Sequence, residues 1–563
     1  MRRAVIAVVA LALLAGCTAV PVYGPVREVT AHPARVNPGV EIAPAPPGPD
    51  VTPAEVVEGF LHAMAAHQPD FSVARAYLTE EANDLWRPDA GVSIYAEGYS
   101  VSVVRGTAIL EAPMVARLTP DGALSQASGT LRHDFGLVED ELGQWRIANP
   151  PDGLLVSQYL FSSSFTDTRL YFWNTDGKWL VPDPRYFRRG SHAPMAAARG
   201  VVTGPSAWLE PVVAPMHPGL SVEDVEVSGS GVAVITLGKA GVRLSSAEQE
   251  ALAVQMVWTF RQFPAVTGVS LRFRGEDAWN VPGSVSGVVP VSAYAEADPV
   301  ERDASHQLYA IADERVVRVG ESAKGVDLVD AGIRLTGVRR AALSADGQRA
   351  VVVSNGELSS VSMSSGRATP ILQAGGLLDP EFSRSGEVWV PDGSERLRVV
   401  LGKDQFEVGL EGVSGAGIRA VRISPEGSRA ALVIRDAAGK QRAGVVLVSR
   451  GEGQITLRGW RPLFLAMNES QVEPEVLDIG WSGTDRLIVL VKDAHGSGVI
   501  TVGSDGASPT SLGAVRGSDL VEIAVAPDAP LVVRSADGQA FRYYADYRWA
   551  LIASGVSAVV YPG

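Results

Sequence analysis

The stretch Leu343-Ser344-Ala345-Asp346-Gly347, which runs into Arg349-Ala350-Val351-Val352-Val353, decides the fold of the C-terminal half. It returns as Ile423-Ser424-Pro425-Glu426-Gly427 before the apolar run 429–434, and in weaker form at 382–386, 481–485 and 525–528. The anchors at positions 344, 383, 424, 482 and 526 lie 39, 41, 58 and 44 residues apart. In each copy a Ser or Asp caps a tight turn between two strands, and Gly supplies a positive φ. Propeller blades repeat every ~40 to 50 residues, so this spacing predicts a β-propeller.

The predicted propeller extends over residues 296–563, because helical periodicity is absent from about residue 300 onward. We expect five to seven blades, with six as the middle value. A β-sandwich with similar turns is the alternative. The 58-residue gap indicates either an insertion around 459–476 or an additional degenerate blade.

Two α+β domains are expected to precede the propeller. In the first, over residues 51–190, Thr52, Pro53 and Glu55 form a helix-start signal with a capping box. Short alternating segments follow, and Asp176-Gly177 marks a hairpin turn. Helices followed by antiparallel strands are typical of an α+β domain.

The second domain is predicted over residues 195–285. Residues 222–227 and 231–237 are typical of two strands, and residues 266–273 of a third. Between them, a capping signal at Ser245 begins a helix that Pro264 ends. The pattern predicts a small α+β module.

Cys17 is the only cysteine of the chain and closes the run Leu14-Ala15-Gly16-Cys17. Two arginines and an apolar stretch of about 12 residues precede it, which is typical of an export signal and is too short for a membrane-spanning helix. The run resembles the bacterial lipobox, where the signal is cut before the cysteine and its sulfur receives a diacylglyceryl group. This predicts a signal peptide at 1–16, lipid attachment at Cys17 and a membrane-anchored protein on the extracytoplasmic face. An ordinary secretory peptide with a chance cysteine is the alternative.

Residues 17–50 are predicted to be the lipidated cysteine and a proline-rich linker. Eight prolines fall between residues 18 and 50, and such chains favour extended, semi-rigid segments.

Composition and motifs argue against several functional classes. The net charge of −14 argues against nucleic-acid binding, which requires basic patches. With Cys17 used for the lipid, no thiol remains, and His62 and His67 are spaced wrongly for one metal-binding helix face. No G-x-S-x-G elbow occurs, and the G-x-G-x-x-A at 415–420 leads into a strand instead of a helix. We therefore expect no catalytic residues, no cofactor and no metal.

A few side chains have two interpretations at this stage. Arg185, Arg188 and Arg189 could hold an anionic partner, although a salt-bridged surface is the commoner arrangement. Asp346 and Glu426 occupy repeat positions, which favours a structural role. The tryptophans at 173, 179, 208 and 258 are expected in the core at domain seams, with interface anchoring as the minority alternative.

The order of these features resembles the actinobacterial LpqB lipoprotein family: lipobox, proline-rich linker, α+β domain, GerMN-like module and C-terminal propeller. The stretches that carry the resemblance are 60–65, 74–79 and 180–186 in the first domain, 254–260 and 264–269 in the second, and 561–563 at the end. The resemblance implies a role beside the Mtr two-component system, through contact with the extracytoplasmic domain of its sensor histidine kinase, in cell-wall growth and division. Only Cys17 is carried over from the family, as the lipid-modified residue.

Two other functions stay open from the sequence. One is a scaffold that binds cell-wall glycan or peptidoglycan without turnover. The other, less favoured, is a propeller hydrolase with catalytic groups at the propeller mouth. The sequence does not identify interface residues, the sensed signal, a ligand of the propeller or the oligomeric state.

Overall fold

The computed structural model describes residues 44–563, which form one compact unit. Short stretches within this range lie outside the description: 67–69, 105–106, 191, 216–218, 240, 301–303, 323–324, 335–336, 393–395, 414–416, 452 and 467–471. Cys17, the predicted signal peptide and most of the predicted linker also lie outside the described residues. Among the described helices, none combines the length and hydropathy needed to cross a membrane.

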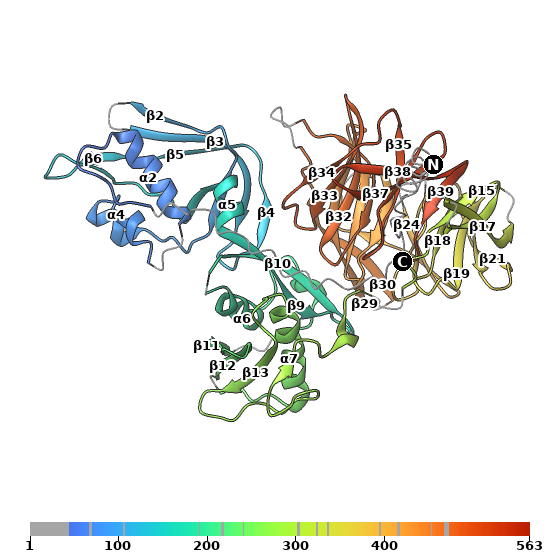
Figure 1. The fold of residues 1–563 in the computed structure, drawn as a ribbon, viewed down its shortest axis with the longest axis horizontal. Coiled ribbons are helices and arrows are strands. Elements are labelled where there is room, and N and C mark those ends of the chain that lie inside the picture. The colour runs from blue at the N-terminus through green and yellow to red at the C-terminus, as the bar shows by residue number, and fades with distance from the viewer. Residues whose placement is uncertain are drawn as a thin grey trace, which may run out of the picture. The chain divides into compact units, whose positions relative to one another are not determined.

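The N-terminal region packs a helix against a sheet. Helix α2 (Pro53–Ala65) begins at the predicted capping box, where the Glu55 amide donates to Thr52 Oγ1 and the Thr52 amide donates to Glu55 Oε2. The apolar face of α2 is buried, and Figure 1 shows the helix beside the sheet of order β2-β3-β1-β8. Strands β4 and β5 also pair with β3. The other elements are α3 (Ser72–Arg75), α4 (Glu80–Leu85), β1 (Val92–Tyr95), β2 (Ser100–Val104), β3 (Thr107–Leu118), β4 (Leu124–Gln126), β5 (Thr130–Asp134), β6 (Leu137–Glu139), β7 (Trp145–Ile147), β8 (Leu154–Ser157) and α5 (Gln158–Ser164).

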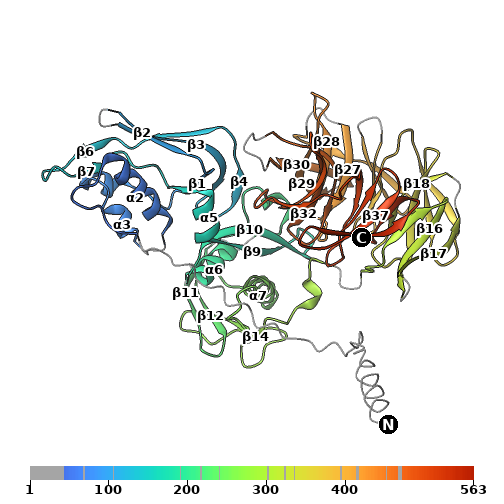
Figure 2. The same cartoon turned by 45° about the horizontal axis from the view of Figure 1, so that its top comes forward.

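The second region is a four-stranded sheet, β11-β12-β13-β14, with two helices. Helix α7 (Ser246–Phe260) begins at a capping box formed by Ser245 and Glu248, as predicted, and packs against β13 and β14 (Figure 2). The other bounds are α6 (Ala193–Thr203), η1 (Glu210–Val212), β11 (Leu220–Val227), β12 (Val232–Lys239), β13 (Gly268–Phe273), β14 (Val289–Pro290) and η2 (Ala295–Ala297).

The hairpin of β9 (Phe165–Trp173) and β10 (Leu180–Arg188) packs in the core of this second region. Leu170 and Phe172 of β9 and Leu180 of β10 share one buried cluster with Ile235 and Met256. The turn contains the predicted Asp176-Gly177, with Gly177 at φ +64°. The sequence predicts that this hairpin is the last part of a first domain ending at residue 190. In the structure its buried side chains belong to the hydrophobic core of the second region.

The C-terminal region forms six sheets, which makes a six-bladed propeller among the described residues. The innermost strands β18, β22, β27, β31, β35 and β39 contact one another in turn and close a ring, as the yellow-to-red part of Figure 2 shows. The predicted fold, two α+β domains followed by an all-β propeller with five to seven blades, is confirmed. The strands are β15 (Tyr309–Ala312), β16 (Arg315–Ser322), β17 (Gly325–Arg334), β18 (Val338–Leu343), β19 (Arg349–Ser354), β20 (Glu357–Ser362), β21 (Ala368–Gln373), β22 (Glu381–Phe382), β23 (Val388–Pro391), β24 (Leu397–Leu401), β25 (Asp404–Glu407), β26 (Gly409–Leu410), β27 (Gly417–Ile423), β28 (Arg429–Arg435), β29 (Gln441–Gly451), β30 (Gln454–Pro462), β31 (Glu475–Trp481), β32 (Arg486–Asp493), β33 (Gly496–Gly503), β34 (Thr510–Gly513), β35 (Leu520–Ala524), β36 (Val532–Ser535), β37 (Gln539–Ala545), β38 (Arg548–Ser554) and β39 (Val556–Val560).

The ring is closed by strands from both ends of the propeller sequence. Strand β39 supplies the innermost strand of the blade whose other strands are β15, β16 and β17. In this pairing Tyr309 lies opposite Val560 and Ala310 opposite Val559. Closing one blade with two distant segments ties the beginning of the propeller to its end.

The 58-residue gap between anchors contains an insertion and no extra blade. Strands β29 and β30 form a hairpin of 11 and 9 residues. The short strand β26 is added beside β30, and residues 463–474 then lead to β31 without forming a sheet of their own in their described part.

Side chains from the second region contact the propeller directly. Trp208 Nε1 donates to the Gly459 carbonyl, and the Arg461 guanidinium lies 4.1 Å from the Trp208 ring centroid. Arg384 of the propeller lies over Trp179 in the same way. Of the four tryptophans predicted as core residues at domain seams, Trp258 is buried in the core. Trp173, Trp179 and Trp208 are half-buried, and Trp179 and Trp208 lie at the seam with the propeller.

Candidate functional site

The repeated turns end the inner strands of the propeller. Ser344 Oγ donates to Asp346 Oδ1, and Gly347 has a φ of +66°. In the second strong copy Ser424 Oγ donates to Glu426 Oε1, and Gly427 has a φ of +78°. The predicted turn chemistry is confirmed, and both acidic residues have the structural role that the repeat indicated.

A cavity of about 140 Å³ lies where these turns converge. All six inner strands contribute to its lining, which makes it the mouth of the propeller channel. This is about ten times the space that one water needs. A concave site with apolar walls and a few converging polar groups is the usual form of a small-molecule site.

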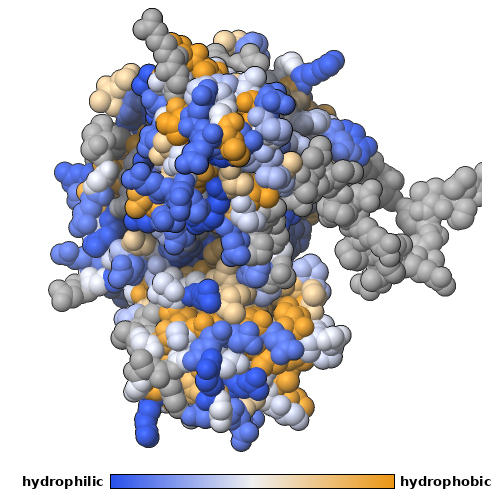
Figure 3. Space-filling view, turned by 90° about the vertical axis from the view of Figure 1, so that its left-hand side faces the viewer, coloured by the Kyte–Doolittle hydropathy of each residue, from blue (hydrophilic) through white to orange (hydrophobic). Residues whose placement is uncertain are grey.

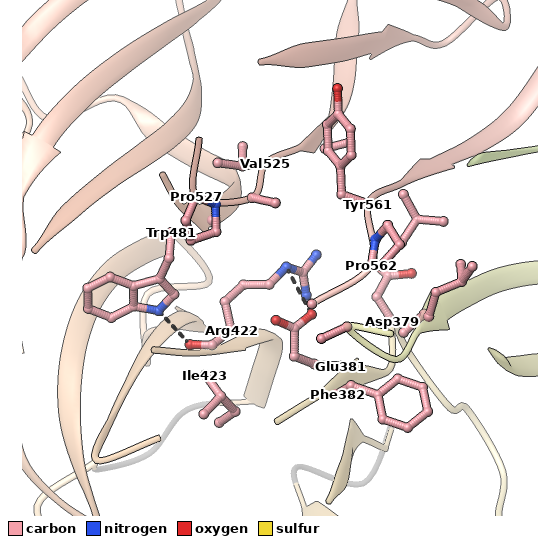
Figure 4. A pocket seen from close by; sticks show the side chains of 18 of the residues that line it. Asp379, Glu381, Phe382, Arg422, Ile423, Trp481, Val525, Pro527, Tyr561 and Pro562 are labelled. Atoms are coloured by element: carbon pink, nitrogen blue, oxygen red, sulfur yellow. Dashed lines mark hydrogen bonds and ion pairs between the residues drawn. The ribbon is translucent and has the colours of Figure 1, made fainter. Parts of the chain in front are cut away.

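Charged side chains from neighbouring blades meet in this cavity. Figure 4 shows the Glu381 carboxylate facing the Arg422 guanidinium, and the closest atoms of the pair are 3.8 Å apart. Arg422 also reaches Asp478 at 3.2 Å, and Arg340 pairs with Asp379 at 2.6 Å. The cluster therefore links four blades by ion pairs.

A second pair completes the charged lining. Glu522 accepts from Arg534 Nε at 2.5 Å and from the Val559 amide at 3.3 Å. Asp478 accepts from the amides of Ile479 and Ile523. These main-chain contacts hold both carboxylates against the inner strands.

Burial dominates the electrostatics of the cluster. It raises the pKa of Glu381 to about 7, although Arg422 opposes the shift, and it raises the pKa of Glu522 to about 7. Burial also raises the pKa of Asp478 above its ordinary value. Two of the carboxyl groups therefore titrate near neutral pH.

Aromatic and aliphatic side chains form the rest of the wall (Figure 4). Trp481 Nε1 donates to the Arg422 carbonyl, and the Tyr561 hydroxyl donates to the Pro530 carbonyl. Phe382 and Ile423 complete this side of the cavity. Because both large rings are held by hydrogen bonds, the cavity has a fixed shape.

Among the described histidines, His306 alone lines this cavity. Cys17 and His67 lie outside the described residues, and His62 is exposed on α2. Across the described parts of the chain, no group of three or more His, Cys, Asp or Glu side chains could hold a metal ion. The G-x-G-x-x-A at 415–420 lies partly outside the description, and its described part belongs to strand β27.

The three predicted arginines do not form one surface cluster: Arg185 is buried, Arg188 is half-buried and Arg189 is exposed. Arg185 is fully buried and pairs with Asp183 and Asp121. Arg188 donates to the carbonyls of Met64 and Ala66 at the end of α2. An anionic partner therefore has no access to Arg185, and the prediction of a surface cluster is wrong for this residue.

The sequence interpretation missed the charged lining, although the repeat contains a signal for it. Glu381 and Arg422 lie two residues before the anchors Ser383 and Ser424, and Arg340, Asp478 and Glu522 lie four residues before theirs. Side chains at even spacing along a strand share one face. Charged residues two or four positions before the anchor serines of the repeats therefore indicate the cluster.

Three family models match consecutive parts of the chain. Residues 46–162 match "Lipoprotein LpqB, N-terminal domain", residues 169–278 match "Sporulation and spore germination" (Germane), and residues 314–562 match "Lipoprotein LpqB beta-propeller domain". The Germane match begins inside strand β9, in agreement with the core to which that hairpin belongs.

Relatives from several actinobacteria match almost the whole chain. "Lipoprotein LpqB" of Cutibacterium acnes is 30% identical over 99% of this chain and 98% of its own length. The proteins of the same name from Thermobifida fusca and Streptomyces coelicolor are 28% and 27% identical, with 98% and 99% of this chain and 97% of each relative covered. With the same three regions in the same order, the chain belongs to the LpqB lipoprotein family.

Proposed function

We propose that this chain is an extracytoplasmic lipoprotein that binds the extracytoplasmic domain of the sensor kinase of an Mtr-type two-component system. It would modulate signalling that affects cell-wall growth and division. The observation that carries the proposal is the family match over nearly the full length, with all three family regions present. The kinase is the partner that the family resemblance implies.

A binding role is supported over catalysis by the chemistry of the cavity at the propeller mouth. Each of the carboxylates Asp379, Glu381 and Glu522 in its lining is paired with a guanidinium group. The matched family descriptions name lipoprotein domains and a propeller, and they name no enzyme. We therefore propose a non-catalytic accessory protein.

Strand β2 is the surface that we propose for the kinase contact. It lies at the edge of its sheet, and among the described strands it pairs with β3 alone. Its five residues, Ser100–Val104, include no charge and no proline, the features with which edge strands usually prevent pairing. Its free main-chain groups can therefore receive a strand from a partner.

The side chains of β2 suit such an addition. Val103 and Val104 are 39% and 64% exposed, so they can pack against an added strand. In the upper part of the face shown in Figure 3 hydrophilic residues predominate, whereas hydrophobic ones gather in its lower part.

Val104→Asp is expected to weaken kinase binding about tenfold or more, because a charge on an edge strand opposes strand addition. The folded state should keep its stability within about 0.5 kcal/mol, since Val104 is exposed. The measurement is a calorimetric titration of residues 44–563, which contain every described hydrophobic core, with the extracytoplasmic domain of the cognate kinase.

The matched control is Leu551→Asp, which places the same charge on an exposed residue of β38, the outer strand of another sheet. Its affinity should stay within about twofold of the unchanged chain. Absence of saturable heat with the folded, unchanged chain contradicts direct binding. A loss of affinity in the control alone contradicts the assignment to β2.

Cys17→Ser is expected to move the full-length protein from the membrane fraction to the soluble extracytoplasmic fraction. The hydroxyl of serine does not replace the thiol that receives the diacylglyceryl group, and the preceding apolar stretch is too short to anchor the chain. Fractionation and intact-protein mass spectrometry measure the outcome. Membrane retention of the variant at the level of the unchanged protein contradicts lipid anchoring at Cys17.

A further inference from the structure

We propose that the cavity at the propeller mouth binds an alkylammonium group, with the Glu381 carboxylate as its counter-ion and the aromatic wall around its methylene chain. This site goes beyond the kinase proposal and does not depend on it. The cavity lies in the propeller, whereas the proposed kinase contact lies on β2.

The ion pairs around the cavity are unequally shared. Four carboxylates meet in or beside it, those of Asp379, Glu381, Asp478 and Glu522, and three guanidinium groups pair with them, those of Arg340, Arg422 and Arg534. Arg340 and Arg534 each pair with one carboxylate, and Arg384, which also lines the cavity, donates to the carbonyls of Asp298 and Pro299. Glu381 and Asp478 therefore share the single guanidinium of Arg422.

Glu381 is the carboxylate with the weakest pairing. Its distance to Arg422 is 3.8 Å, against 3.2 Å for Asp478. Asp478 accepts two main-chain hydrogen bonds, whereas Glu381 accepts one, from Ile423. Its side chain is 23% exposed and lines the cavity, whereas that of Asp478 is 8% exposed and lies behind it. A cation entering the cavity meets Glu381 as the available counter-charge.

The surroundings favour an organic cation over other ligands. An anion would need an available guanidinium; Arg340 and Arg422 are paired with carboxylates, and Arg384 donates to the carbonyls of Asp298 and Pro299. A metal ion would need several ligands of the right kind, and the described residues contain no such group. Trp481, Phe382 and Tyr561 line the cavity, and apolar walls of this kind suit a short alkyl chain.

This chemistry has two possible sources, a free amine and the side chain of a lysine in a peptide or protein. Both present an ammonium group at the end of a methylene chain. The experiment uses a separate probe for each source.

The test titrates the full-length chain in detergent with 1,5-diaminopentane and with an acetylated, amidated Gly-Lys-Gly peptide, followed by ligand-observed NMR. Pentan-1-ol and pentanoate are the neutral and anionic controls. We expect saturable binding of at least one ammonium probe and of neither control. Binding of the peptide alone assigns the site to lysine side chains, and binding of the diamine assigns it to free amines.

Glu381→Gln removes the charge and keeps the shape of the side chain, so it is expected to weaken binding about tenfold. Glu407→Gln is the matched control, because Glu407 lies on the outer strand β25 of the same blade and is exposed. Its affinity should stay within about twofold of the unchanged chain. Equal affinities for the two variants overturn the proposal.

A pH series on the unchanged chain gives a second readout that needs no variant. The charged groups nearest Glu381 are those of Asp379, Asp478, Glu522, Arg340 and Arg422. The side chains of His306 and Arg384 also line the cavity. The Glu381 pKa of about 7 means that this carboxyl loses its charge as the pH falls from 8 to 6, while an amine with a pKa of about 10 stays charged. We expect the affinity to fall about tenfold over this interval. Absence of binding by both ammonium probes at pH 8, or affinity independent of pH, overturns the proposal.

Discussion

Replacing Arg429 with methionine is expected to lower the free energy of unfolding of the propeller by about 3 to 5 kcal/mol. The side chains of Arg429 and Glu426 are 1% and 0% exposed and pair at 2.8 Å. Arg429 also donates to the Thr484 carbonyl and to Ser504 Oγ, so it links the repeat turn to the next blade. Removing the guanidinium leaves a buried carboxylate without its counter-charge, which is the costly way to break such a pair.

Urea unfolding followed by circular dichroism measures this change as a shift of the midpoint. The matched control is Arg396→Met, which breaks the pair with Glu407, whose two side chains are 53% and 57% exposed. An exposed pair contributes about 0 to 1 kcal/mol, so the control should hardly move the midpoint. Equal effects of the two substitutions would contradict the structural role assigned to Arg429.

Val559→Asp is expected to prevent closure of the propeller ring. Val559 is 3% exposed and lies on β39, opposite Ala310 of β15. A carboxylate in this core must be buried without a partner or protonated, and either costs several kcal/mol. That cost is a large fraction of the roughly 5 to 15 kcal/mol of a folded domain.

Limited proteolysis and thermal unfolding of residues 44–563 measure the loss. We expect cleavage within the propeller and a lowered melting temperature, because the blade that joins both ends of the ring opens. Ser557→Asp places the same charge two residues earlier on an exposed position of β39, and it should leave both measurements unchanged. An intact, protease-resistant Val559→Asp variant would show that β39 does not hold the ring together.

Local signals in the sequence were sufficient for the beginnings of helices and for the blades. The capping boxes at Thr52 and Ser245 start α2 and α7 because their hydrogen bonds involve residues three positions apart. The repeated turn at Ser344 and Ser424 depends in the same way on residues within one turn. Counting its copies therefore predicted the propeller and bracketed the six blades.

Features that depend on distant contacts were not predictable in this way. The hairpin of β9 and β10 follows the first region in sequence, but Phe172 and Leu180 are buried among residues 55 or more positions later, such as Ile235 and Met256. From the sequence Arg185 is expected at the surface, but the structure buries its side chain against Asp183 and Asp121. The cavity cluster brings Glu381, Arg422 and Asp478 together only when the ring closes.

Hydrogen–deuterium exchange of residues 44–563, with and without the extracytoplasmic domain of the kinase, tests the central claim most directly. The main-chain amides of β2 that point away from β3 have no partner strand among the described residues, so they should exchange quickly in the free protein. We predict that the kinase domain slows exchange at Ser100–Val104 and leaves the outer strand β38 unchanged. Protection confined to the propeller, or no protection at saturating kinase domain, would contradict it.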